Sequence, residues 1–161
     1  MVIILMGVTG SGKTTVGKAL AKDLGWTYYD ADDFHPDHNV QKMAQGTPLD
    51  DDDRWPWLEI IAAQIGVWGE AEGAVILGCS ALKQSYRDIL VGERKNVHIV
   101  HLRGQKDLIA RRLETRQDHY MPASLLDSQF ETLEEPCDAL SVDIAPEPSA
   151  IAAAIRRELK L

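Results

Sequence analysis

Residues 7–14 read Gly-Val-Thr-Gly-Ser-Gly-Lys-Thr, and this stretch decides the fold. It matches the phosphate-loop pattern G-x-x-x-x-G-K-[S/T] at every defined position. The apolar run Val2–Met6 precedes it, and a helical pattern with Val16, Leu20 and Leu24 on one face follows it. Strand, glycine-rich loop and helix N-terminus thus come in the order that phosphate binding requires, whereas a mere glycine-rich turn between two core elements is disfavoured. We expect a nucleoside triphosphate to contact Gly7, Gly10, Ser11, Gly12, Lys13, Thr14 and Thr15.

Length and composition predict one domain over residues 1–161. The formal net charge of −8 disfavours partners such as nucleic acid or an anionic membrane. No apolar run approaches the ~20 residues of a membrane span. The two cysteines, Cys79 and Cys137, lack the spacing of a metal site, and the phosphate loop begins too early to follow a signal peptide. We therefore expect reduced thiols and a cytoplasmic protein.

Apolar runs alternate with amphipathic stretches along the chain, which is typical of βαβ units. We expect an α/β fold of three αβα layers, with a mostly parallel five-stranded sheet and ligands at the carboxyl ends of the strands. Apolar residues at helical spacing, such as Leu58, Ile61 and Ile65, predict the intervening helices. The expected strands are residues 2–6, 26–30, 73–78, 96–102 and 140–144.

The second expected strand ends in Asp30-Ala31-Asp32. In a parallel sheet these aspartates reach the same rim as the phosphate loop, and strand alternation places both on one side. One carboxylate can hold the Mg²⁺ that accompanies the phosphates, together with Thr14, and the other can accept a proton from an attacking hydroxyl. The alternative is a solvated acidic turn. The pattern alone leaves open which aspartate takes which role.

The following segment offers further polar groups. His35 and His38 suggest either a transition-metal site or a polar contact from His35 to a hydroxylated substrate, and the second interpretation is favoured. Residues 50–53 are four aspartates, which predict the capped start of a helix rather than a Mg²⁺ site. Arg54 follows them and is a candidate for a substrate carboxylate, or for pairing with the neighbouring aspartates.

Three candidates for acceptor binding follow the third expected strand. Ser80 can cap the next helix or touch the substrate. Lys83 and Arg87 are four residues apart, so on a helix they share one face and can hold an anion. The alternative is an ordinary solvated basic face.

Arg112 and Arg116 are also four apart, at the end of an expected helix. They suit a lid, over about residues 116–136, that brings arginines onto the nucleotide phosphates, where they neutralise charge in the transition state. The alternative is an arginine pair that favours the helix dipole. Guanine-nucleotide motifs such as Asn-Lys-x-Asp are absent from the sequence, which favours a small-molecule kinase over a GTPase.

The sequence resembles the gluconate kinases of the small phosphate-loop type, relatives of shikimate and nucleoside-monophosphate kinases. The resemblance covers nearly the whole chain and depends on many ordered blocks. The blocks are residues 7–13, Asp-x-Asp-x-x-His-Pro at 30–36, Asn-Val-Gln-Lys-Met at 39–43, Gly-Thr-Pro-Leu at 46–49, Asp-Asp-Asp-Arg at 51–54, Cys-Ser-Ala-Leu-Lys at 79–83, Tyr-Arg-Asp at 86–88, His-Tyr at 119–120 and Ser-Gln-Phe-Glu-Thr-Leu-Glu at 128–134.

The resemblance implies transfer of a phosphoryl group from ATP, with Mg²⁺, to the terminal hydroxyl of D-gluconate, a helical lid, and often a homodimer. By similarity to shikimate kinases, Asp32 matches the carboxylate that faces the substrate and Asp30 the one near Mg²⁺. We therefore expect Asp32 to act in catalysis together with Lys13 and Arg112. The runner-up is a phosphate-loop kinase of another small hydroxy acid or of a nucleotide. A nucleotide-binding regulator without catalysis is a third possibility, against which the aspartate pair argues.

Overall fold

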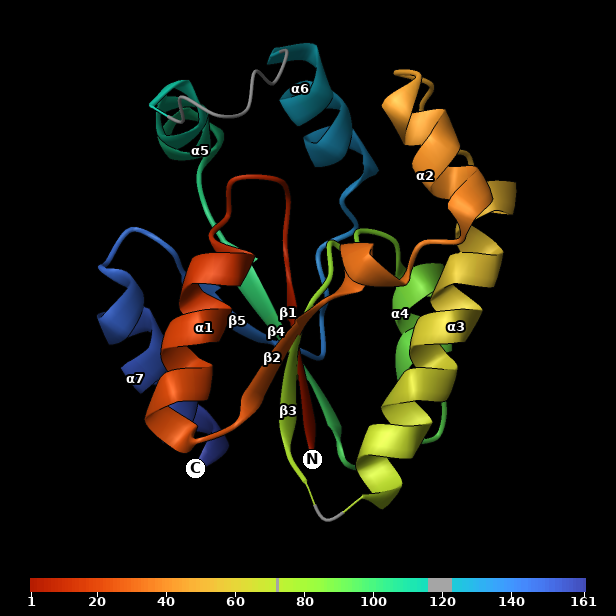
Figure 1. Cartoon of the computed structure of the whole chain (residues 1–161). Helices are drawn as coiled ribbons and strands as arrows, with labels where there is room; N and C mark the ends of the chain where they lie inside the picture. The colour runs from red at the N-terminus through yellow and green to blue at the C-terminus, as the bar shows by residue number, and fades with distance from the viewer. Residues whose placement is uncertain (72, 116–122) are drawn as a thin grey trace.

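The structure is a computed structural model that describes residues 1–71, 73–115 and 123–161. A five-stranded sheet lies between two layers of helices, and every described strand pair is parallel (Figure 1). The expected αβα fold is confirmed. The strands lie in the order β2-β3-β1-β4-β5 and are β1 (Val2–Met6), β2 (Thr27–Asp30), β3 (Val75–Gly78), β4 (Val97–Arg103) and β5 (Leu140–Asp143).

The bounds of β1 match the sequence prediction, and those of the other four strands differ from it by one or two residues. β2 and β3 begin later than their apolar patterns suggest, because the pairing between them starts at Thr27 and Val75. β3 lies between β1 and β2, so the carboxyl ends of these three strands form one continuous rim.

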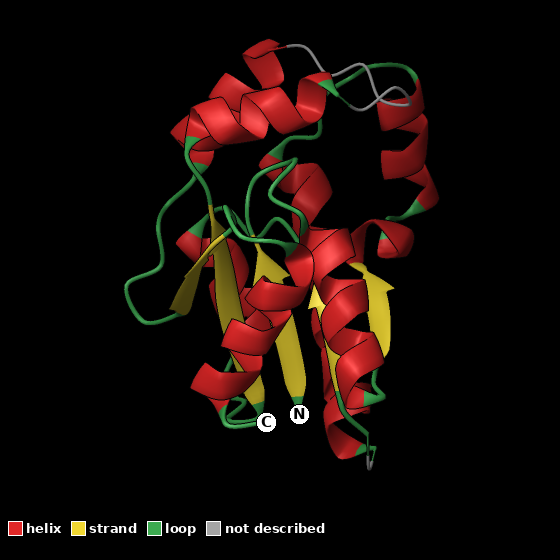
Figure 2. Cartoon of the chain, turned by 90° about the vertical axis from the view of Figure 1, so that its left-hand side faces the viewer, coloured by secondary structure: helices red, strands yellow, loops and turns green. Residues whose placement is uncertain are grey.

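Two helices cover each face of the sheet, and the remaining helices lie beyond the carboxyl ends of the strands. Figure 2 shows this last group gathered above the arrowheads of the sheet. None of the described helices is both long and apolar enough to cross a membrane. One face carries α1 (Lys13–Leu24) and α7 (Pro148–Leu159), and the other carries α3 (Asp51–Glu70) and α4 (Gln84–Val91). Beyond the carboxyl ends lie α2 (Asp37–Ala44), α5 (Lys106–Glu114), α6 (Ala123–Thr132) and the 3₁₀ turn η1 (Ala31–Phe34).

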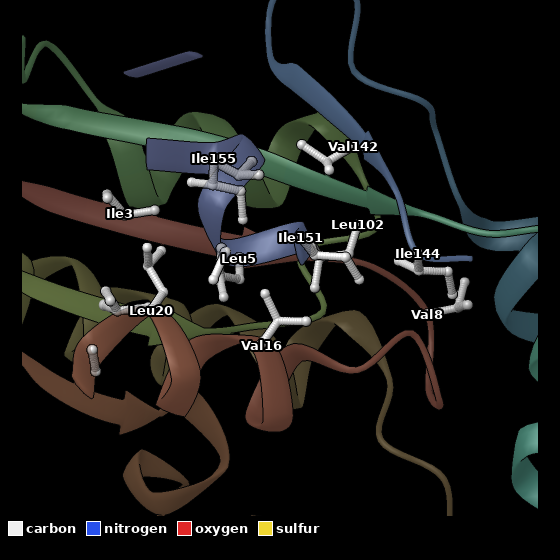
Figure 3. Close-up of a cluster of buried hydrophobic side chains, with 14 of the residues drawn as sticks. Ile3, Leu5, Val8, Val16, Leu20, Leu102, Val142, Ile144, Ile151 and Ile155 are labelled. Atoms are coloured by element: carbon white, nitrogen blue, oxygen red, sulfur yellow. The ribbon is translucent and has the colours of Figure 1, made fainter. Parts of the chain in front are cut away.

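The core forms on both sides of β1, whose residues are all fully buried. Ile3 and Leu5 face α1 and α7, whereas the alternate residues of the strand face α3. A strand covered on both faces needs apolar residues at every position, which explains the unbroken run before the phosphate loop. Figure 3 shows the first cluster, which includes Val16, Leu20, Leu102, Val142, Ile144, Ile151 and Ile155.

The aspartates at the start of α3 form a capping box. A carboxylate oxygen of Asp50 accepts from the N–H of Asp53 at 2.9 Å, and the carboxylate of Asp53 accepts from the N–H of Asp50 at 3.0 Å. This pair satisfies two N–H groups that the first turn leaves without partners. No group of three potential ligands arranged for a metal ion occurs among the described residues. The capping interpretation is therefore confirmed.

Candidate active site

The loop between β1 and α1 has the backbone of an anion cradle. Gly10 and Gly12 have φ angles of 75° and 94°, a left-handed region that residues with a side chain rarely adopt. A Cβ at Gly10 would also lie 2.9 Å from the side chain of Leu113, so glycine is required there twice over. The first N–H groups of α1 have no acceptors within the helix and are available to a phosphate.

The side chain of Lys13 folds over this loop. Its Nζ donates to the main-chain oxygens of Gly7 and Val8, both at 3.0 Å. Ser11 has a place inside the loop, because its N–H donates to the oxygen of Val8 at 3.2 Å and its side chain is fully buried. Thr15 lies in the first turn of α1 and is exposed. Contacts of Ser11 and Thr15 with a nucleotide stay predictions.

Asp30 and Asp32 meet at the same rim, although not by the expected route. β2 ends at Asp30, and a carboxylate oxygen of this residue caps the 3₁₀ turn by accepting from the N–H of Asp32 at 3.0 Å. The prediction from strand alternation is therefore wrong, since the turn and not the pleat places Asp32. The side chain of Asp32 is 82% exposed, which leaves its carboxylate accessible to a bound hydroxyl.

A cavity of about 370 Å³ separates the phosphate loop from the two aspartates. It brings together the loop, the end of β2, the end of β3 and one residue of α6. Of the residues predicted to contact an acceptor, Asp32 and Ser80 line this cavity. The lining residues are Thr9, Gly10, Gly12, Lys13, Thr14, Asp30, Asp32, Gly78, Cys79, Ser80 and Gln129.

His35 lies behind Asp32 and is held from two sides. Its ring stacks on Trp57 with centroids 4.3 Å apart, and its Nδ1 lies 3.2 Å from Nδ2 of Asn39. Because an amide nitrogen donates, Nδ1 accepts, and the ring proton is assigned to Nε2, which lies 3.7 Å from Asp32. The neighbouring imidazole lowers the pKa of Asp32, the charge of Lys13 adds to this, and burial opposes it. Asp32 is therefore ionised at neutral pH.

Thr14, Asp30 and Tyr28 form an oxygen cluster at the edge of the cavity. The hydroxyl of Tyr28 lies 3.5 Å from Oγ1 of Thr14 and 3.4 Å from Oδ2 of Asp30, and burial raises its pKa to about 12. A hydroxyl and one carboxylate beside a phosphate site suit Mg²⁺, which takes few protein ligands and completes its shell with phosphate oxygens and water. The residues present fit this ion.

Lys83, predicted to hold an anionic acceptor, is paired within the protein. Its Nζ lies 3.0 Å from one carboxylate oxygen of Asp51 and 3.2 Å from the other. The hydroxyl of Tyr86 also donates to Asp51, and these contacts keep the pKa of that carboxyl below its usual value. Arg54, at the first turn of α3, adds positive charge beside the group. Contacts of Lys83 and Arg54 with an acceptor stay predictions.

Arg87 does not share an exposed helix face with Lys83, and that part of the prediction is wrong. Lys83 precedes α4 as its cap residue, and Arg87 is only 2% exposed. The Arg87 guanidinium donates to the main-chain oxygens of Ala81, Leu82 and Glu134 at 2.9, 3.1 and 2.8 Å. It therefore joins α4 to the segment after α6.

Arg112 lies on α5 and donates to the main-chain oxygen of Ile144 at 2.6 Å, which ties α5 to the end of β5. Arg116 and residues 117–122 of the expected lid lie outside the described residues. A second hollow of about 640 Å³ lies at the ends of β4 and β5, where it is lined by side chains such as Arg103 and Phe130. It does not include the two aspartates.

Comparisons with known proteins show the family of the chain. The family model described as an AAA domain matches residues 3–124. A probable gluconokinase from Xenopus tropicalis is 44% identical over 99% of this chain and 93% of its own length. The thermosensitive gluconokinase of Escherichia coli strain K12 is 47% identical over 83% of this chain and 71% of its own length. The chain belongs to the gluconokinase family.

A crystal structure of a gluconokinase from Sinorhizobium meliloti 1021 superposes with a TM-score of 0.83 at 39% identity, covering 98% of this chain and 94% of the other. The family that the ordered motifs indicated is therefore confirmed.

Three site residues of this gluconokinase-family member were not singled out from the sequence. Gln129 lines the cavity from α6, Asn39 orients His35, and Tyr28 lies between Thr14 and Asp30. Each is a single polar residue within an otherwise ordinary helix or strand pattern. Only the burial of Asn39, which is 2% exposed, marks one of them as unusual, and burial is not visible in the sequence.

Proposed function

We propose that this chain transfers the γ-phosphoryl group of ATP to the terminal hydroxyl of D-gluconate, giving 6-phospho-D-gluconate. The observation that carries the proposal is that Lys13 of the phosphate loop and the ionised Asp32 line the same cavity. A phosphoryl donor bound at the loop and a hydroxyl bound at Asp32 would then face each other. Membership of the gluconokinase family supplies the substrate pair.

Most of the catalysis is positioning and electrostatics, because phosphoryl transfer needs little covalent help from the protein. The loop amides and Lys13 bind the β- and γ-phosphates. Asp32 accepts a hydrogen bond from the acceptor hydroxyl and takes its proton as the new O–P bond forms. Thr14 and Asp30 are the residues that would hold Mg²⁺, which when bound would neutralise part of the phosphate charge.

The carboxylate of gluconate needs a cationic partner. Lys83 and Arg54 remain as predicted candidates, since the guanidinium of Arg87 donates to main-chain oxygens. His35 contributes by polarising Asp32. Binding of gluconate by Lys83 requires that its pair with Asp51 be shared or exchanged.

The proposed reaction includes closure of a lid over the nucleotide. We assign a lid to about residues 116–136, with Arg112 and Arg116 reaching the nucleotide phosphates as it closes. Arg112 would then exchange its bond to Ile144 for a phosphate oxygen. We further propose a cytoplasmic homodimer that acts on small molecules rather than on nucleic acid or membranes, in keeping with the net charge of −8.

A coupled assay of ADP formation across acceptors tests the function. The panel contains D-gluconate, other sugar acids, shikimate and nucleoside monophosphates, each with Mg·ATP. We expect turnover with D-gluconate to exceed that with every other acceptor. Turnover with another acceptor but not with gluconate would make the chain a related kinase. Tight ATP binding without turnover of any acceptor would instead indicate a nucleotide-binding regulator.

A further inference from the structure

Gln129 connects α6 to the phosphate loop. Its carboxamide oxygen accepts a hydrogen bond from the N–H of Thr9 at 2.6 Å, across 120 residues of sequence. Of the described residues that line the cavity between the loop and the aspartates, Gln129 is the only one that α6 contributes. Figure 1 shows α6 beyond the carboxyl ends of the strands. The cavity is lined there by Asp30 and Gly78, the last residues of β2 and β3.

The hydrogen bond fixes which way the carboxamide is turned. An N–H of the main chain can only donate, so the atom it meets must be Oε1. The other arm, Nε2, carries two donor hydrogens, and it makes no hydrogen bond within the described part of the chain. Because Gln129 lines the cavity together with Asp30 and Asp32, its carboxamide adds a neutral donor group to a lining that also holds two carboxylates.

The position of Gln129 is set by packing and by the segment that follows it. Leu126, one turn earlier on α6, is buried in the core cluster of α1 and α7. After the helix, the N–H of Glu134 donates to the oxygen of Leu82 at 2.9 Å, and its carboxylate accepts from the N–H of Gln84 at 2.7 Å. The carboxamide is thus held by contacts on both sides of it along the chain, which is the preorganisation that electrostatic catalysis requires.

We propose that Gln129 is a further catalytic residue, whose Nε2 donates a hydrogen bond to the γ-phosphoryl group as it is transferred. This inference rests on the proposed function, because it places that group between Lys13 and Asp32. The bond from Thr9 orients the carboxamide beside the phosphate loop. Nε2 then stabilises charge on an equatorial oxygen of the transferred group. A neutral donor does this without competing with Mg²⁺ or Lys13 for the phosphates.

The competing explanation is that Gln129 merely satisfies the N–H of Thr9. Two variants separate the roles. Gln129→Glu keeps an oxygen that can accept from Thr9 but replaces the donor arm with an anionic oxygen. Gln129→Met has a similar length and removes both functions. Glu131→Ala, at an exposed position of the same helix, is the matched control.

The measurements are kcat, and the Kd values of ATP and ADP from titrations without acceptor. We expect kcat to fall about 10²-fold in both Gln129 variants, as for the loss of one preorganised donor. We also expect Gln129→Glu to raise the Kd of ATP at least 10-fold while changing the Kd of ADP less than twofold, because only ATP has a γ-phosphate. Glu131→Ala should match the wild type.

Wild-type kcat in Gln129→Glu, or an equal loss of ATP and ADP binding in both variants, would overturn the assignment in favour of a loop-holding role. If the unmodified protein binds ATP but turns over no gluconate, the proposed function fails by itself. In that case the Kd values of ATP and ADP in the Gln129 variants still show whether Gln129 contacts the γ-phosphate.

Discussion

The guanidinium of Arg87 donates a hydrogen bond of 2.8 Å to the main-chain oxygen of Glu134 and so joins α4 to the chain that leaves α6. That bond comes from Nη2, whereas Nη1 donates to the main-chain oxygens of Ala81 and Leu82, which follow the end of β3. One buried side chain therefore connects the rim that carries Ser80 with the helix that carries Gln129. The two walls of the cavity are coupled through a residue that does not line it.

Arg87→Lys tests this coupling. A lysine has one nitrogen and cannot reach all three oxygens, so buried carbonyl groups lose their partners. We expect the free energy of unfolding to fall by about 3 kcal/mol in urea denaturation. Arg111→Lys, at an exposed position of α5, should change it by less than about 0.5 kcal/mol. Unchanged stability combined with a tenfold rise in the KM of gluconate would restore Arg87 to the acceptor site.

The error over Arg87 shows where sequence patterns stop being informative. The spacing of four between Lys83 and Arg87 indicates a shared face only if both residues are helical, and the helix begins at Gln84. The partner of Arg87 lies 47 residues away, and no local pattern marks such a contact. The parallel sheet correctly predicts the rim of Asp30 and Asp32, but strand alternation does not place both side chains, since a 3₁₀ turn begins directly after Asp30.

The phosphate loop and the sheet were predictable because their determinants are local. Glycines with positive φ, an apolar strand and a helix start each have a sequence signature that acts over a few residues. Gln129 and Asn39 lie in blocks of the family resemblance, but no local pattern indicates what either residue does, because an amide side chain on an amphipathic helix is usually solvated. Their roles come from tertiary packing, which brings Thr9 to one and His35 to the other.

Gly17→Ala should destabilise the protein despite adding a better helix former. A Cβ at this position would lie 2.4 Å from the ring of Tyr28, a side chain that also lies close to Gly78 at the end of β3. Overpacking of this kind costs about 1–3 kcal/mol and exceeds the gain of about 1 kcal/mol in helix propensity. Gly66→Ala is the matched control, because it is also within a helix and its Cβ would meet nothing closer than 3.7 Å. Thermal unfolding should show the first variant less stable than the wild type and the second at least as stable.

The pair of Lys42 and Asp53 predicts a loss of stability in acid. The Lys42 ammonium lies 2.5 Å from the Asp53 carboxylate, and this contact, with the N–H of Asp50, holds the pKa of Asp53 far below its usual value. A carboxyl whose pKa is lower in the folded state stabilises the fold above its unfolded pKa of about 4 and loses that contribution as the pH falls. We expect the Tm of Asp53→Asn to depend less on pH between 5 and 3 than that of the wild type. Asp52→Asn, an exposed neighbour, should keep the wild-type dependence; an equal slope in all three proteins would contradict the assignment.

His35 should set the pH at which Asp32 stops acting as a base. The neighbouring imidazole is the main cause of the lowered pKa of Asp32. In the wild type, Asp32 therefore remains ionised at a pH below the usual pKa of an aspartate. Removing the ring in His35→Gln raises the pKa of Asp32, and the fraction of ionised base then falls at a higher pH. We expect the acid limb of kcat/KM for gluconate to move to higher pH, with little change at pH 8.

Asp32→Asn should lower kcat about 10²–10⁴-fold at every pH, because no base is left to titrate. His38→Gln, whose ring lies 3.2 Å from Asp53 rather than beside Asp32, serves as the control and should keep the wild-type limb. Urea denaturation of each variant separates a shifted limb from unfolding in acid, and an unmoved limb in folded His35→Gln would show that the imidazole does not govern Asp32.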